Sequence, residues 1–151
     1  MKRARTLLVA SNDDFLESVT DWLTRDARIE VVGRAHTGSE ALERVETLRA
    51  ELVLVDVTLP DMNGFEVARR IKARLAAPAV ILLSFFDSQA VRHEAWLAGA
   101  DALVAKHEMT ERLNTLAGEL LRPRPNSSTF RERPANVIPS AGEDTGKRGS
   151  S

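Results

Sequence analysis

Several features are missing from this sequence, and each absence removes a class of function. It has no cysteine, so disulfide bonds, thiolate metal sites and cysteine nucleophiles are excluded. No apolar run approaches the ~20 residues of a membrane span, and the run after the basic N-terminus is too short for a signal peptide. The formal net charge of −1 argues against a protein built to coat nucleic acid or an anionic membrane. We therefore expect a soluble, cytoplasmic protein that does not bind membranes.

The sequence divides at Arg122. The first 122 residues have the apolar content of one domain of ordinary size. Residues 123–151 contain four of the six prolines, and Phe130, Val137 and Ile138 are their large apolar residues. Such a segment buries too little surface to offset its ordering entropy. We predict a folded domain over 1–122 and a disordered Pro/Gly/Ser-rich tail over 123–151. The tail is weakly basic and could touch an acidic partner, although a solvated tether is the favoured interpretation.

The first 122 residues alternate between short apolar runs and longer amphipathic segments. The short runs are Thr6–Ala10, Ile29–Gly33, Leu52–Asp56, Ala79–Ser84 and Ala102–Ala105. Two of them are continuously apolar over residues 52–55 and 80–83, which is typical of central strands in a parallel sheet covered on both faces. We therefore expect five strands that share one parallel sheet.

The segments between these runs have apolar residues at helical spacing. Phe15, Val19, Trp22 and Leu23 fall at i, i+4, i+7 and i+8. The pattern recurs at Ala41, Leu42, Val45 and Leu48 and at Phe65, Val67, Ala68, Ile71 and Leu75, and further helices are expected at Ser88–Leu97 and Met109–Leu121. Residues 11–14 offer an N-cap with acids in the first turn, and Gly99 offers a C-cap. Five strand–helix repeats predict an α/β fold, (βα)₅, which is a doubly wound, flavodoxin-like three-layer sandwich.

Three polar residues end strands of this predicted sheet, at the edge where α/β proteins place their sites. Asp56 closes a run of four apolar residues, although a strand buried on both faces usually excludes charge. A carboxylate there could accept a phosphoryl group, and Lys106 could carry its ammonium to the Asp56 oxygens. Ser84 could bond an added phosphoryl oxygen. The alternative is that Asp56 only terminates its strand or caps a helix.

The sequence resembles the receiver domain of two-component response regulators over residues 5–121. The main motif is LVLVDVTLPDMNGFEVARRIKA at 52–73, and a second is GADALVAK at 99–106. The resemblance implies that Asp56 is the phospho-acceptor, Ser84 the switch hydroxyl and Lys106 the phosphate-pairing lysine. It assigns Thr58, Pro60 and Gly64 to the loop after the acceptor.

The sequence departs from the family at the metal site. Receivers end the first strand with two adjacent acids that hold Mg²⁺, whereas the matching positions here are Ala10 and Ser11, or Ser11 and Asn12. Mg²⁺ prefers carboxylates, phosphate and water as ligands. If a metal binds at all, its carboxylate ligands are at most Asp13 and Asp56, and Asp14 is the other residue that could replace the missing acids. The favoured interpretation of Asp13 and Asp14 is that they are acids in the first turn of a helix. We expect Mg²⁺ binding to be weak or absent. Two further departures are Leu103, where the family commonly has an aromatic residue, and His107, where proline is common.

Two functions remain open for this stand-alone, atypical receiver, and neither is an enzyme. In the first, Asp56 accepts a phosphoryl group from a histidine kinase or phosphotransfer protein, with weakened metal dependence. In the second, a pseudo-receiver binds a partner without phosphorylation. The output would come from another protein or a homodimer. A flavodoxin-like cofactor binder is disfavoured because SNDDFLE, after the first strand, is not a glycine-rich phosphate loop. Direct nucleic acid binding is not expected, because no helix-turn-helix pattern follows residue 122.

Overall fold

The computed structural model of the chain describes residues 3–121, so the predicted tail at 123–151 lies outside the described residues, as does Arg122. The strands are β1 (Ala4–Val9), β2 (Ile29–Ala35), β3 (Leu52–Asp56), β4 (Ala79–Ser84) and β5 (Ala102–Ala105). The helices are α1 (Asp13–Leu23), α2 (Gly38–Thr47), α3 (Gly64–Lys72), α4 (Gln89–Leu97) and α5 (Met109–Leu121), with a short 3₁₀ turn, η1 (Lys106–Glu108), before α5. This order confirms the predicted (βα)₅ fold.

All five strands run parallel in one sheet, in the order β2-β1-β3-β4-β5. The chain adds β2 on one side of β1 and then crosses to add β3 on the other side. The strand order therefore reverses between β1 and β3. In open α/β sheets, sites form outside the carboxyl ends of the strands at such a point. Asp56, the last residue of β3, lies at this edge.

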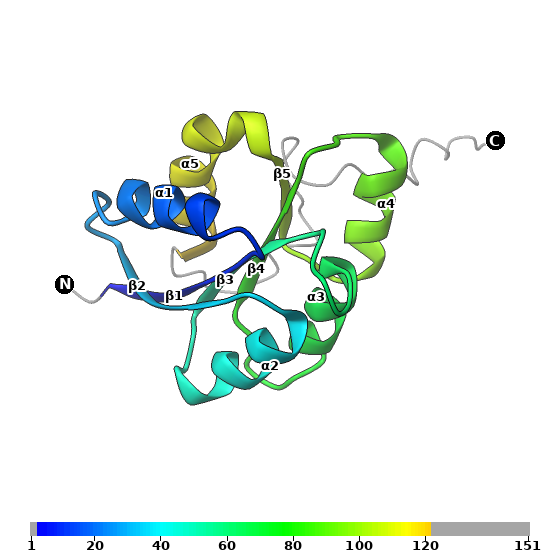
Figure 1. Cartoon of the computed structure of the whole chain (residues 1–151), viewed down its shortest axis with the longest axis horizontal. Coiled ribbons are helices and arrows are strands. Elements are labelled where there is room, and N and C mark those ends of the chain that lie inside the picture. Colours follow the sequence, from blue (N-terminus) through cyan, green and yellow to red (C-terminus); the bar gives the residue numbers. More distant parts are fainter. Residues whose placement is uncertain (1–2, 122–151) are drawn as a thin grey trace.

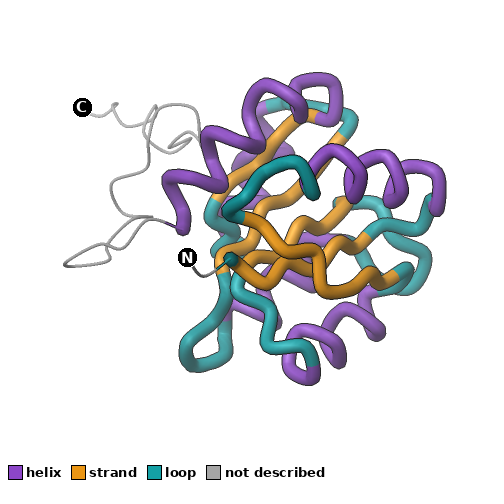
Figure 2. The backbone as a smooth tube through the Cα atoms, turned by 90° about the vertical axis from the view of Figure 1, so that its left-hand side faces the viewer, coloured by secondary structure: helices purple, strands orange, loops and turns teal. Residues whose placement is uncertain are grey.

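The helices cover the sheet on both faces. Figure 1 shows α1 and α5 together on one face and α2 and α3 on the other, with α4 beside α3. Figure 2, turned by 90°, shows the strands as a layer between the two layers of helices. The central strand β3 is buried along its whole length, which explains its continuous run of apolar residues. Within the described chain, no helix is long and apolar enough to cross a membrane.

Lys72 and Asp101 fix the connection between α3 and the start of β5. Lys72 Nζ lies 2.8 Å from Asp101 Oδ2, and the backbone N–H of Val80 donates to the same oxygen at 2.8 Å. Both side chains of the ion pair are mostly buried. Gly99, one residue past the α4 cap Ala98, has a φ of 84°, a conformation that favours glycine.

The structure differs from the sequence prediction in two helices. Leu75 was expected on the apolar face of the third helix, but α3 ends at Lys72 and Leu75 is 97% exposed. This prediction is wrong, because the chain turns after the helix and reaches a left-handed residue at Ala76, where φ is 53°. In α1, Leu16 is fully buried, whereas Phe15 and Trp22 are half-buried at the margin of the apolar face.

Some boundaries also shift by one or two residues. β1 starts at Ala4 and ends at Val9, whereas the predicted strand ran from Thr6 to Ala10. β2 continues two residues beyond the predicted end, to Ala35. Ser88, expected as the first residue of a helix, is the N-cap of α4, and its side chain accepts the backbone N–H of Val91 at 3.2 Å. The predicted bounds of β3, β4, β5 and α5 are confirmed.

Candidate functional site

Asp56 and Lys106 meet at the carboxyl edge of the sheet. Lys106 is the first residue after β5, and its Nζ lies 2.7 Å from Asp56 Oδ2. The side chain of Lys106 is 13% exposed and that of Asp56 is 9% exposed, so solvent screens the pair less than it screens a surface ion pair. The backbone N–H of Thr58 donates to the other oxygen, Oδ1, at 3.0 Å. Each carboxylate oxygen therefore has a hydrogen-bond donor.

The Asp56–Lys106 pair lies in a pocket of about 390 Å³. The pocket is lined by Ser11, Asn12, Phe15, Asp56, Thr58, Phe85 and Lys106. Two of these residues place aromatic rings over the ammonium: Lys106 Nζ lies 4.6 Å from the ring centroid of Phe15 and 4.2 Å from that of Phe85. The pocket thus combines one carboxylate and one ammonium with aromatic walls.

The loop after Asp56 is held close to the sheet by backbone hydrogen bonds. Val57 N–H donates to Leu83 O at 2.9 Å, and Gly64 N–H donates to Val57 O at 2.7 Å. A Cβ at Gly64 would collide with the carbonyl oxygen of Asp56, so glycine is required where α3 begins. Pro60 lies on the exposed part of this loop.

Asp61 anchors the same loop to the start of α2. Its carboxylate accepts the backbone N–H groups of Gly38 at 2.7 Å and Ser39 at 3.0 Å. These two bonds hold the pKa of Asp61 below its ordinary value. Sequence reasoning missed this role. The available signal was an acid two residues before Asn63, the N-cap of α3. Local sequence does not show that this acid bonds the start of a different helix, α2.

Ser84 is buried at the end of β4 but does not line the pocket. In the sheet, Ser84 is paired with Ala105 of β5, and the preceding residue of β4, Leu83, is paired with Asp56 of β3. The Ser84 hydroxyl accepts the backbone N–H of Phe86 at 3.0 Å, so in this conformation it supports the turn that follows β4. The structure therefore brings the Lys106 ammonium and the Thr58 backbone N–H into direct contact with Asp56. Ser84 lies close by in the sheet, and its oxygen accepts the Phe86 N–H.

The oxygen ligands near Asp56 do not match those that Mg²⁺ usually takes. Asp13 is 80% exposed, and its Oδ1 lies 2.6 Å from His36 Nε2. Asn12 Oδ1 accepts the backbone N–H of Phe15 at 2.8 Å and caps α1. Across residues 3–121, no group of three or more histidines and acids lies close enough to hold a metal ion. Asp56 is then the one carboxylate among the lining residues, and Lys106 occupies one of its oxygens.

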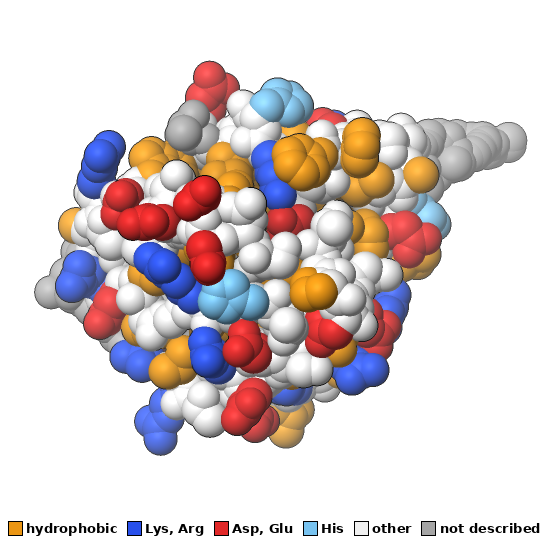
Figure 3. All heavy atoms as spheres, in the orientation of Figure 1, with side chains coloured by type: hydrophobic (Ala, Val, Ile, Leu, Met, Phe, Trp, Pro, Cys, Tyr) orange, Lys and Arg blue, Asp and Glu red, His pale blue; other side chains and the backbone are white. Residues whose placement is uncertain are grey.

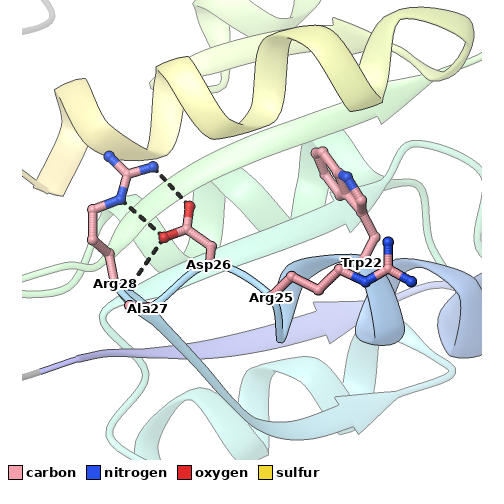
Figure 4. A pocket seen from close by; sticks show the side chains of 5 residues that line it. All are labelled: Trp22, Arg25, Asp26, Ala27 and Arg28. Carbon is pink, nitrogen blue, oxygen red and sulfur yellow. Dashed lines mark hydrogen bonds and ion pairs between the residues drawn. The ribbon is translucent and has the colours of Figure 1, made fainter.

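A second pocket, of about 340 Å³, lies at the turn between α1 and β2 and is lined by Trp22, Arg25, Asp26, Ala27 and Arg28. Figure 4 shows the side chains of Asp26 and Arg28 facing each other. Asp26 accepts the Arg28 side chain at 3.0 and 2.7 Å and the Arg28 backbone N–H at 2.9 Å. The side-chain hydrogen bond from Arg28 is the main reason that the pKa of Asp26 is lowered. Both oxygens of the Asp26 carboxylate accept hydrogen bonds from Arg28, so this carboxylate stabilises the turn and is not available to a ligand.

The surface carries charges of both signs. On the face shown in Figure 3, Lys and Arg side chains are interspersed with Asp and Glu, and no broad field of one sign is visible. This agrees with the near-zero net charge of the sequence.

Comparison with known proteins gives the same family as the sequence motifs. A family model of the response regulator receiver domain matches residues 6–117. A protein-glutamate methylesterase/protein-glutamine glutaminase of Syntrophus aciditrophicus is 36% identical over 110 residues, which are 72% of this chain and 31% of that protein. Chemotaxis protein CheY of Listeria monocytogenes is 27% identical over 107 residues, or 71% of this chain and 90% of that protein. The signal receiver domain of the putative response regulator NarL from Mycobacterium tuberculosis superposes with a TM-score of 0.76 at 24% identity, covering 82% of this chain and 100% of that one.

A doubly wound parallel sheet with a carboxylate–ammonium pair at its switch point is the architecture of a signalling receiver. The chain belongs to the response regulator receiver domain family, whose members act in two-component signalling. It spans less than half the length of the methylesterase relatives that it matches. The receiver family is generally non-enzymatic, and the match to the methylesterases covers the receiver region.

Proposed function

We propose that this receiver accepts a phosphoryl group on Asp56 and that it does so with weak dependence on Mg²⁺. The observation that supports the proposal is the mostly buried Asp56–Lys106 pair at the switch point, with 2.7 Å between Oδ2 and Nζ. Charged side chains are rarely buried unless they are paired or used. The open pocket beside the pair has room for a phosphoryl group.

The chemistry is nucleophilic displacement at phosphorus. An oxygen of the ionised Asp56 carboxylate attacks the phosphorus of a phosphohistidine or an acyl phosphate. The new O–P bond forms as the P–N or P–O bond to the donor breaks, and the donor leaves with that electron pair. Asp56 releases no proton, because it is already a carboxylate. The Lys106 ammonium then faces the added phosphoryl oxygens, which raise the local negative charge.

The metal dependence is proposed from the donor set. Receivers commonly use Mg²⁺, which is usually held by one or two carboxylates together with phosphate and waters. Here Ala10 and Ser11 carry no charge, and Asp13 is paired with His36. Under this proposal, Lys106 supplies the nearest positive charge, and the residues at the pocket supply too few hard ligands for a tight metal site.

A second candidate function rests on the same absence of an acid pair at Ala10 and Ser11. A pseudo-receiver would keep the fold and the Asp56–Lys106 pair as structure and would bind its partner without phosphorylation. The specific observations in its favour are that the Lys106 ammonium occupies one oxygen of Asp56 and that Ala10 and Ser11 bring no negative charge to the pocket. In the first function we propose a histidine kinase or phosphotransfer protein as the partner. In either function an output protein or a second copy of the chain would carry the signal onward.

One experiment separates the two functions. The full chain is incubated with acetyl phosphate, with EDTA or with millimolar Mg²⁺, and intact mass is measured for wild type and Asp56→Asn. We expect labelling of wild type that changes little with Mg²⁺ and no labelling of Asp56→Asn, because an amide cannot form the acyl phosphate. Absence of labelling under both conditions would favour the pseudo-receiver. Labelling that survives in Asp56→Asn would place the acceptor elsewhere.

A metal titration tests the weak Mg²⁺ dependence directly. Backbone amide shifts around Ser11 and Asp56 are followed by NMR as Mg²⁺ is added. We expect these shifts to stay nearly constant up to millimolar metal, since the pocket lacks the acid pair. Saturable shifts at sub-millimolar metal would contradict this part of the proposal and would indicate that Asp13 or Asp14 had turned into the site.

A further inference from the structure

The ammonium of Lys106 is enclosed on two sides by aromatic rings. Phe15 comes from the first turn of α1, and Phe85 follows β4 directly after Ser84. Their ring centroids lie 4.6 and 4.2 Å from Lys106 Nζ, within the ~6 Å at which a ring attracts a cation. The ammonium therefore has one carboxylate oxygen and two ring faces as neighbours.

Phe85 is exposed to solvent, so packing in the core does not explain its position over Lys106. Its side chain is 69% exposed, so burial of the ring adds little to stability. Phe86, the next residue, is 70% exposed and offers a matched comparison, because it makes no cation–π contact with any of the described residues. An exposed Phe is ordinary by itself, so its placement over Lys106 carries the argument.

The rings restrict a side chain that is otherwise flexible. Lysine has a four-carbon stem and a strongly hydrated point charge, and holding it in one geometry costs rotamer entropy. Ring faces exclude water from two sides of the ammonium and attract it through their quadrupoles. Both effects strengthen the interaction between Nζ and the carboxylate. In a pocket with few hard ligands for a metal, they fix the one positive charge that faces a phosphoryl group.

We infer that Phe15 and Phe85 are positioning residues that hold the Lys106 ammonium on Asp56 for phosphoryl acceptance. The inference rests on the proposed function, because it names the residues that prepare that site. Each ring acts on the site through its contact with Lys106. Their effect is preorganisation: the ammonium is already placed where negative charge develops.

The test uses a graded series at Phe85, where the exposed position makes misfolding an unimportant risk. The series consists of wild type, Phe85→Trp, Phe85→Leu and a ring-fluorinated phenylalanine at position 85, which keeps the shape and weakens the quadrupole. Phe86→Leu is the matched control, and Phe15→Leu examines the second ring. Two quantities are measured for each full-length protein: the NMR shifts of the Lys106 side-chain protons and the rate of labelling by acetyl phosphate without metal.

Ring faces shift nearby protons upfield, so the Lys106 signals report the geometry without any reaction. We expect upfield Lys106 signals in wild type that move toward ordinary values in Phe85→Leu and stay in place in Phe86→Leu. The labelling rate should fall about two- to five-fold in Phe85→Leu, the rate equivalent of a cation–π contact at an exposed site. The labelling rate of the protein with the fluorinated ring should lie between the rates of wild type and Phe85→Leu. Phe85→Trp should be labelled at the wild-type rate.

The outcomes separate the inference from the proposed function. Ordinary Lys106 shifts in wild type, or equal labelling rates across the Phe85 series, would overturn the inference. Labelling rates that correlate with the melting temperatures of the variants, and not with the quadrupole of the ring, would assign Phe85 a purely structural role. That result would also overturn the inference. If wild type is not labelled at all, the proposed function fails, while the Lys106 shifts of Phe85→Leu against Phe86→Leu still decide whether the rings hold the ammonium.

Discussion

Replacing Asp56 with asparagine removes the negative charge of the site and nearly preserves its shape. The carboxylate has two oxygens in use: Oδ2 accepts Lys106 Nζ at 2.7 Å, and Oδ1 accepts the Thr58 backbone N–H at 3.0 Å. An asparagine has one acceptor oxygen, so one of these donors loses its partner. A hydrogen bond to a charged group is worth about 1.5–3 kcal/mol and a neutral one about 0.5–1.5 kcal/mol. We expect Asp56→Asn to lower the free energy of unfolding by about 1–2 kcal/mol.

Thermal unfolding without metal measures this loss. For a domain of this size, the expected change corresponds to a melting temperature about 3–8 °C lower. Glu43→Gln is the control, because it removes one negative charge from an exposed position on α2. That control should change stability by less than about 0.5 kcal/mol.

The sign of the result distinguishes this pocket from one that is crowded with acids. Clustered carboxylates repel one another, so removing one of them in the absence of metal relieves strain. A clear rise in melting temperature for Asp56→Asn would therefore refute the charge-balanced site. Lys106→Met offers a second check, because it leaves a mostly buried carboxylate without its cation and should cost about 2–4 kcal/mol. The double variant should lose less than the sum of the single losses, by about 1 kcal/mol, and simple additivity would contradict direct pairing.

Three other predictions concern the stability of the domain. The Arg28 side chain holds the pKa of Asp26 below its ordinary 3.8, so the pair's stabilisation is present above that pH and is lost as pH falls through the lowered pKa. Asp26→Asn should therefore destabilise the protein at pH 6, and in denaturant titrations at successively lower pH its difference from wild type in the free energy of unfolding should shrink as pH passes through the lowered pKa. Truncation after Arg122 should leave the melting temperature within a few degrees of wild type, and a larger drop would show that residues 123–151 pack on the domain. Leu75→Lys should change the free energy of unfolding by less than about 0.5 kcal/mol, because Leu75 is 97% exposed.

The strands could be predicted closely because burial on both faces imposes a composition that few other environments allow. Residues 52–56 form a strand in which every residue is buried, and their apolar run marks both its ends. Helix ends are less determined by sequence. Leu75 continues the apolar period of α3 for one more turn, but the backbone leaves the helix before it reaches that residue. Periodicity describes which face a helix would bury and does not say where the helix stops.

The main pair of the site could also be predicted, since topology brings the carboxyl ends of parallel strands to one edge. Asp56 ends β3 and Lys106 directly follows β5, and the sheet order places these two strands on either side of β4. The contacts of Phe85 with Lys106 and of Asp13 with His36 could not be predicted in this way. They depend on side-chain directions in loops and helix starts, and neither the period of a helix nor the pleat of a strand fixes those directions.

The balance of charge at Asp56 links the fold to both candidate functions. One carboxylate and one ammonium leave the unphosphorylated site close to neutral, and two aromatic rings lie over the ammonium. Phosphorylation would replace a charge of −1 with one of roughly −1.5 to −2, against the same ammonium. The groups that could donate to the added oxygens are backbone donors such as the Thr58 N–H and the hydroxyl of Ser84, whose oxygen accepts the Phe86 N–H. Because a hydroxyl can donate its proton while its oxygen accepts, Ser84 could bond a phosphoryl oxygen and still keep the Phe86 N–H. A movement of Ser84 on phosphorylation would then carry the turn after β4 with it.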